Sequence, residues 1–158
     1  MIRFKEFSYG ASSAVITSLA IIVGLSSIIN AKITILTALF IIAIADNISD
    51  SFGIHIYQES STASAKDVKR TTTSNFIARI IVSAVFILFI LFLPMTIAVI
   101  LSAIFGLSVI ATISYRIAKL QKEKSYKMIF RHLLLAIVVM IASFFLREIV
   151  ANMMTKIV

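Results

Sequence analysis

The chain has 158 residues, 60% of them hydrophobic, and its mean hydropathy is +1.06. A soluble domain is nearer half apolar, so the composition predicts an all-α integral membrane protein. The absence of cysteine excludes disulfides and thiolate metal sites. The net charge of +8 in such a chain indicates topology signals and not nucleic-acid binding.

A membrane-spanning helix needs about 20 apolar residues, and five segments of this chain qualify. The N-terminus is too short and too charged for a cleavable signal, so the first apolar run is predicted to be retained. Pro94 is predicted to begin a helix after a very short hairpin, since proline is tolerated in a first helical turn. In a single domain of residues 1–158, the spans are predicted at about 9–29, 33–56, 76–93, 95–117 and 129–151, with cytoplasmic loops at 57–75 and 118–128.

Basic residues orient the predicted spans. Twelve of the fifteen fall on one side: Arg3, Lys5, Lys66, Lys69, Arg70, Arg79, Arg116, Lys119, Lys122, Lys124, Lys127 and Arg131. Only Lys32, Arg147 and Lys156 fall on the other. The positive-inside rule then predicts a cytoplasmic N-terminus and an outer C-terminus, which agrees with an odd number of spans. The small size and isoleucine-rich composition favour a prokaryotic plasma membrane.

The second predicted span carries Asp46, Asn47 and Asp50 well away from its ends. A charge at membrane depth costs roughly 2.5–3.5 kcal/mol on insertion scales, so such residues usually mark an ion or proton pathway. On a helix, Asp46, Ser49, Asp50 and Gly53 share one face. Their carboxylate and hydroxyl oxygens are hard donors that suit Mg²⁺, Mn²⁺ or Fe²⁺.

Two further sets of polar residues extend this candidate site. Ser51, His55 and Glu59 form a second stripe near the cytoplasmic end of the span, where His55 and Glu59 are suited to receiving a metal ion or a proton. The first span has a polar edge consisting of Ser12, Ser13, Thr17 and Ser18. At 1.5 Å per residue, Ser13 and Thr17 reach depths comparable to Gly53 and Asp50, so spans one and two are predicted to share a polar cluster.

A structural reading competes with the ion pathway. Buried aspartates can be neutralised by a basic neighbour, and among the other spans only Arg79 and Arg147 could supply one. Arg79 is expected near the cytoplasmic start of the third span, and Arg147 near the outer face beside Glu148. Neither arginine is therefore predicted at a depth that matches the two aspartates.

The segment AIADNISDSFGIHIYQESS (43–61) resembles the second-helix signature of the vacuolar iron transporter family, A-D-A-I-S-M-x-x-G-E-Y-x-S. The first span resembles the family's first helix, D-G-L-V-x-x-L-A-L-V-x-G, and residues 91–110 resemble its third-to-fourth helix turn. The positions in register are Ala45, Asp46, Ile48, Ser49 and Gly53, and Leu19, Ala20, Ile21 and Gly24. The resemblance implies a homodimer that exports Fe²⁺ or Mn²⁺ from the cytoplasm in exchange for protons, with the ion path between the two copies.

The chain departs from the family pattern at the site. The acid of the family's first helix falls on Ser13, the methionine of its second-helix signature on Asp50, and its glutamate on Ile54. The glutamate-rich metal-binding domain of the family is missing from the short polar connection. Asp50 is expected to replace the carboxylate missing at Ser13, with an altered site geometry and no sulfur ligand.

The leading hypothesis is a dimeric, proton-coupled transporter of divalent metal cations in the lipid bilayer. Its metal-binding candidates are Asp46, Asp50, Asn47, Ser49, Ser13, His55 and Glu59. No resident cofactor, no catalytic residue and no nucleic-acid partner is predicted, because no nucleophile–base pair or hydrolase motif is present. The alternative is a non-transporting scaffold or partner subunit whose buried aspartates are structural.

Overall fold

The computed structural model describes residues 4–60 and 64–154, and nearly all of them are helical. The all-α prediction is therefore confirmed for the described part of the chain. The elements in order are α1 (Phe4–Leu25), α2 (Ala31–Ile41), the π-helical turn η1 (Ile42–Asp46), α3 (Asn47–Ser60), α4 (Ala65–Phe92), α5 (Met95–Gln121) and α6 (Ser125–Met154).

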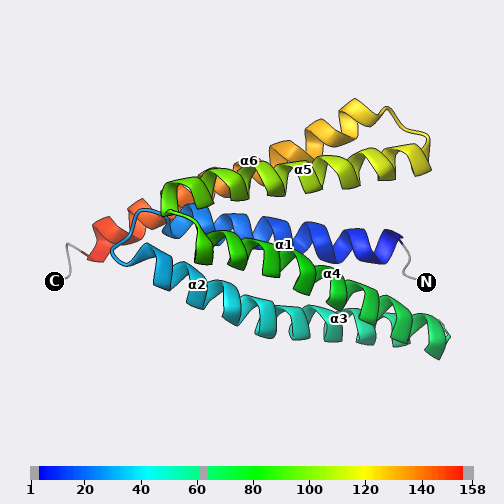
Figure 1. The fold of residues 1–158 in the computed structure, drawn as a ribbon. Coiled ribbons are helices and arrows are strands. Elements are labelled where there is room, and N and C mark those ends of the chain that lie inside the picture. The colour runs from blue at the N-terminus through cyan, green and yellow to red at the C-terminus, as the bar shows by residue number, and fades with distance from the viewer. Residues whose placement is uncertain (1–3, 61–63, 155–158) are drawn as a thin grey trace.

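Five helices in the described residues are long and apolar enough to cross a membrane, as predicted. The second of them is the continuous helix Ala31–Ser60, made of α2, η1 and α3. The two ends of the chain lie at opposite ends of the bundle (Figure 1). The α3–α4 and α5–α6 connections lie at the same end as the N-terminus, which we call the basic end. Which end faces the cytoplasm stays a prediction.

The helices extend beyond the predicted spans, chiefly at the basic end. α4 begins at Ala65 and not at residue 76, so most of the segment predicted as the loop 57–75 is helical. Ser64 caps this helix, since its hydroxyl accepts a hydrogen bond from the Asp67 backbone N–H at 3.2 Å. The loop predicted at 118–128 is likewise reduced to the short turn between α5 and α6. The prediction counted apolar residues only, whereas the helical hydrogen bonds continue through polar turns.

α1 packs against α4, α5 and α6 and forms the centre of the bundle. Two glycines allow close helix contacts. A Cβ on Gly10 would lie 2.6 Å from the backbone oxygen of Asn75 in α4, and one on Gly106 in α5 would lie 2.8 Å from Leu19 Cδ1. The contact at Gly10 brings α1 close to α4 at the level of the polar residues described below.

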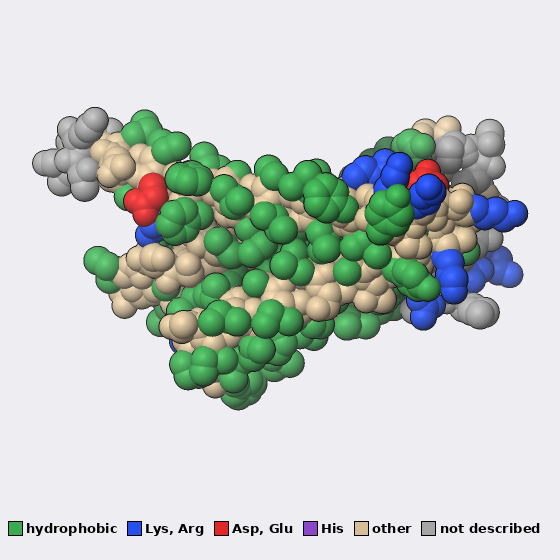
Figure 2. Space-filling model, turned by 90° about the horizontal axis from the view of Figure 1, so that it is seen from above, with side chains coloured by type: hydrophobic (Ala, Val, Ile, Leu, Met, Phe, Trp, Pro, Cys, Tyr) green, Lys and Arg blue, Asp and Glu red, His purple; other side chains and the backbone are tan. Residues whose placement is uncertain are grey.

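The outer helices leave most of their apolar surface uncovered. Only 6% of the candidate membrane-spanning segment of α6 is buried, and only 17% of the corresponding segment of the helix Ala31–Ser60 is buried. Hydrophobic side chains cover the sides of the molecule, and lysines and arginines gather at the basic end (Figure 2). This distribution is expected of a protein whose sides contact lipid.

Candidate cation site

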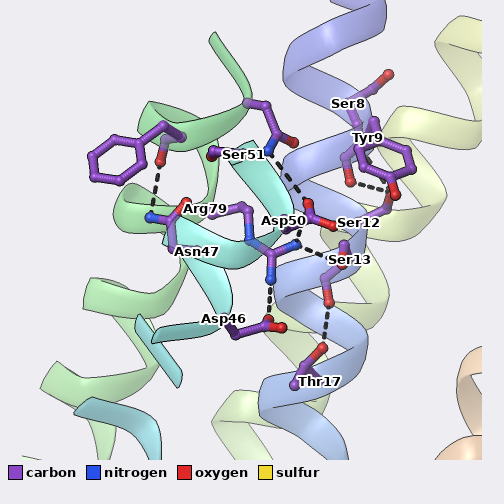
Figure 3. A network of polar contacts seen from close by, with 12 residues as sticks. Ser8, Tyr9, Ser12, Ser13, Thr17, Asp46, Asn47, Asp50, Ser51 and Arg79 are labelled. Atoms are coloured by element: carbon purple, nitrogen blue, oxygen red, sulfur yellow. Dashed lines mark hydrogen bonds and ion pairs between the residues drawn. The ribbon is translucent and has the colours of Figure 1, made fainter. Parts of the chain in front are cut away.

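Arg79 of α4 is the centre of a polar cluster that joins three helices (Figure 3). Its side chain is almost completely buried, with a residue exposure of 2%. Nη1 donates hydrogen bonds to Asp50 Oδ2 at 3.0 Å and to Ser13 Oγ at 2.7 Å. Nη2 donates to Asp46 Oδ2. Both aspartates of the second predicted span are therefore ion-paired with the same guanidinium.

The prediction that Arg79 lies at a different depth from Asp46 and Asp50 was wrong. It placed Arg79 four residues into a span that was taken to begin at residue 76. Because α4 begins at Ala65, Arg79 lies well inside the helix, beside the middle of the antiparallel Ala31–Ser60 helix. The sequence held one signal for this, the Ser64-x-x-Asp67 pattern that marks a helix N-terminus.

Two buried asparagines support the cluster, and sequence reasoning missed one of them. Asn75 Nδ2 lies 3.3 Å from Asp50 Oδ2 and 3.4 Å from Ser51 Oγ, so it donates toward the same carboxylate as Arg79. Asn47, predicted as an auxiliary metal ligand, instead donates from Nδ2 to the backbone oxygen of Phe76 at 3.3 Å. Asn47 therefore faces α4 and helps to hold α3 in place.

A groove of about 680 Å³ runs beside the cluster. Its lining contains Asp46, Ser49, Asp50 and Gly53, which confirms that these four residues share one face. The remaining lining residues are Tyr9 of α1, Thr71 and Asn75 of α4, and Ile54, Tyr57 and Gln58 of α3. The groove thus lies between α1 and α3 and reaches α4.

The two aspartates keep part of their surface open to this groove. The side chain of Asp46 is 42% exposed and that of Asp50 is 25% exposed. Arg79 contacts only Oδ2 of each carboxylate, so one oxygen of each is not engaged by the guanidinium. Two carboxylates and one guanidinium give the cluster a formal charge of −1, which favours a cation in the groove.

The other predicted ligands are divided among separate places. His55 and Glu59 are paired at 3.3 Å and line a different groove with Ala65 and Val68. Ser12 lines a third cavity, between α1, α5 and α6, and Thr17 donates to the backbone of Ser13 within α1 at 3.0 Å. Ser13 is the residue of the first span's polar edge that joins the cluster around Arg79. In the described part of the chain, no three His, Cys, Asp or Glu side chains are arranged to hold a metal ion.

A second ion pair within a predicted span lies in α6. Arg147 Nη2 donates to Glu148 Oε1, and the guanidinium carbon lies 5.1 Å from the centre of the Phe144 ring. Glu148 was expected beside Arg147, and the pair lies at the opposite end of the bundle from the basic end. This pair is separate from the groove and provides an internal reference for tests of the cluster.

The atoms available to a cation in the groove are carboxylate, hydroxyl and amide oxygens, which suit hard ions. Ser49, Thr71 and Asn75 can supplement the two aspartates. No known family model, no curated protein and no solved structure matches this chain.

Proposed function

We propose that this chain is a membrane transporter of cations, with the divalent metals Mn²⁺ and Fe²⁺ as its first candidate substrates. The observation that carries the proposal is the cluster of charge −1 on the wall of the groove. Asp46 and Asp50 bind the ion, and Ser49 of the groove lining assists. The family resemblance implies export from the cytoplasm coupled to proton entry. The chemistry of the site is compatible with this coupling, because a carboxylate that releases a metal can take up a proton.

Stability alone is a poor reason for such a cluster. Charged side chains in membrane helices are costly and usually functional. Replacing a buried ion-pair triad by apolar residues of similar volume is often neutral or stabilising. A cluster that serves packing would also need only one carboxylate to neutralise Arg79. The second carboxylate, which leaves an excess negative charge, is the part that a cation explains.

In this proposal Arg79 acts as a tethered cation. A metal ion reaches both carboxylates fully only if it displaces hydrogen bonds of the guanidinium, so Arg79 competes with the ion and favours its release. The charges also suggest the stoichiometry. One divalent ion on one chain leaves the site at +1, whereas two facing clusters together neutralise one divalent ion. A homodimer with the ion between its copies satisfies this balance.

The test is cation flux into proteoliposomes under an imposed pH gradient, with a panel of divalent ions. We expect Asp46→Asn and Asp50→Asn each to abolish flux, because each removes the excess negative charge. Glu148→Gln is the matched control, since it neutralises a carboxylate of the other intramembrane ion pair and should keep flux. Full flux in both aspartate variants would refute the proposal.

The second candidate is a helical partner subunit without transport activity. The observation that favours it is that one buried arginine pairs with both aspartates. Thermal unfolding of the detergent-solubilised protein with and without Mn²⁺ separates the two candidates, because a ligand that binds only the folded state raises its apparent stability. A Mn²⁺-dependent increase that Asp50→Asn removes supports transport. No increase with any cation, together with no flux, supports the subunit.

A further inference from the structure

The turn between α5 and α6 carries a compact basic groove that the proposed transport does not use. This groove of about 490 Å³ is lined by Glu123, Lys124, Lys127, Phe130 and Arg131. We call it the α6 basic groove. Its three cations and one carboxylate give it a net charge of +2, and the carboxylate pairs with Arg131 at 3.2 Å. The groove is therefore complementary to an anion.

The turn that presents these cations is short and well defined. Lys122 adopts a left-handed conformation with φ of 56°, and the Glu123 backbone N–H donates to Ala118 O at 3.0 Å. This pattern ends α5 in the manner of a Schellman-type cap. α6 then begins at Ser125, so the cations stand on or next to a helix and not on a long loop.

The face of α6 that carries the cations continues into an apolar stripe. Lys127 and Arg131 are followed at helical spacing by Leu134, Val138 and Ile141, which are 48%, 54% and 51% exposed. Phe130, beside the groove, is 67% exposed. One helix face thus offers positive charge at the basic end and uncovered apolar surface toward the middle of the bundle.

We propose that the α6 basic groove binds the phosphate headgroup of an anionic phospholipid whose acyl chains lie along the apolar stripe. The positive charge matches the headgroup, and the exposed stripe matches the chains. A soluble phosphate compound would use only the first of these features, and the continuity of the face therefore favours a lipid. Cations near an anionic membrane surface contribute roughly 1 kcal/mol each, which corresponds to about fivefold in affinity.

The test is native mass spectrometry of the full chain in phosphatidylcholine micelles titrated with phosphatidylglycerol. Lys124→Gln/Lys127→Gln should weaken phosphatidylglycerol binding by about fivefold for each lysine removed. Lys66→Gln/Lys69→Gln, which removes the same charge at the same end of the molecule, should leave binding near wild type. Glu123→Gln should strengthen binding, because it removes the only acidic side chain lining the groove and frees Arg131. A gain of this kind cannot arise from misfolding.

Three results would overturn the proposal. Equal loss in both lysine pairs would show that binding follows overall charge and not the groove. Displacement of the lipid by millimolar inorganic phosphate would show a site for free anions instead. Retained phosphatidylglycerol preference in the Lys124/Lys127 variant would also exclude the groove.

Discussion

At the scale of single residues, the behaviour of the site depends on the number of charges around Arg79. Either aspartate alone neutralises the guanidinium, and the two together leave one negative charge in excess. Removing one carboxylate therefore leaves a balanced pair. Removing both leaves a buried cation with neutral partners only, and such an uncompensated charge is strongly destabilising.

We expect this charge balance to produce a non-additive effect on stability. Asp46→Asn and Asp50→Asn should each change the free energy of unfolding by less than about 1 kcal/mol. The double variant should lose about 3–5 kcal/mol, the usual cost of an unpaired buried charge. Denaturant unfolding in detergent measures the difference between the double variant and the sum of the single variants.

Removal of Arg79, which has no carboxylate partner in the double variant, provides the control. Adding Arg79→Met to the double variant should restore most of the lost stability, since the buried cation is then absent. Strictly additive losses, or no rescue by Arg79→Met, would show that the three charges do not form one unit.

Sequence reasoning found part of this cluster. Asp46 and Asp50 were identifiable because acids are rare inside an apolar segment. Ser13 was identifiable because the two spans run antiparallel. Arg79 was seen but assigned to the wrong depth, because hydropathy locates the lipid-compatible part of a helix and not the point where the helix starts. Asn75 was missed, because it lies in a polar stretch that was read as a loop.

At the scale of elements, the turn η1 explains how the second helix presents its polar face. Buried or partly buried residues recur at every fourth position along this helix: Ile35, Leu39, Ala43, Asn47 and Ser51. In an uninterrupted α-helix, with about 3.6 residues per turn, Leu39 and Asn47 would be rotated about 80° apart. The wider π turn takes up one extra residue and keeps both on the buried side.

This geometry predicts the effect of a deletion. Without Ala43, Leu39 and Asn47 are seven residues apart, which is close to two α-helical turns. The helix can then become α-helical throughout and keep Leu39 and Asn47 on its buried side. Deletion of Ala43 should therefore lower the free energy of unfolding by no more than about 2 kcal/mol. Denaturant unfolding in detergent measures this cost.

Deletion of Ile48 is the matched control, because it also removes one apolar residue from the same helix. It alters the spacing between Asp46 and Asp50, and no π turn lies between them to absorb the change. It should be clearly more destabilising than deletion of Ala43. Equal losses would mean that η1 has no role in register.

At the scale of the whole molecule, hydropathy alone was enough to predict five spans but not their arrangement. α1 has the lowest mean hydropathy of the five membrane-spanning helices, and its membrane-spanning segment is the most buried, at 50%. α6 is more apolar and only 6% buried. In lipid the outer helices need apolar surfaces, whereas the central helix needs small and polar side chains for close contact. α4, however, is the most apolar of the five and still 44% buried, so apolarity does not order these helices by burial and could not identify the central helix.

The orientation of the bundle is the prediction on which transport direction depends, and the chain is well suited to a test. It contains no cysteine, so each introduced thiol is the only one present. Ile29, 90% exposed between α1 and α2, lies at the end opposite the exposed Gln121 at the end of α5. Most lysines and arginines are at the end of Gln121, so this end should face the cytoplasm.

We therefore expect a membrane-impermeant maleimide to label Ile29→Cys in intact cells and to label Gln121→Cys only after permeabilisation. The two variants serve as controls for each other, because both positions are exposed and lie at opposite ends of the same bundle. The reverse pattern would place the α6 basic groove outside the cell and would turn the proposed export into uptake. Labelling of both variants in intact cells would indicate two orientations, and the charge asymmetry between the ends would then not determine topology.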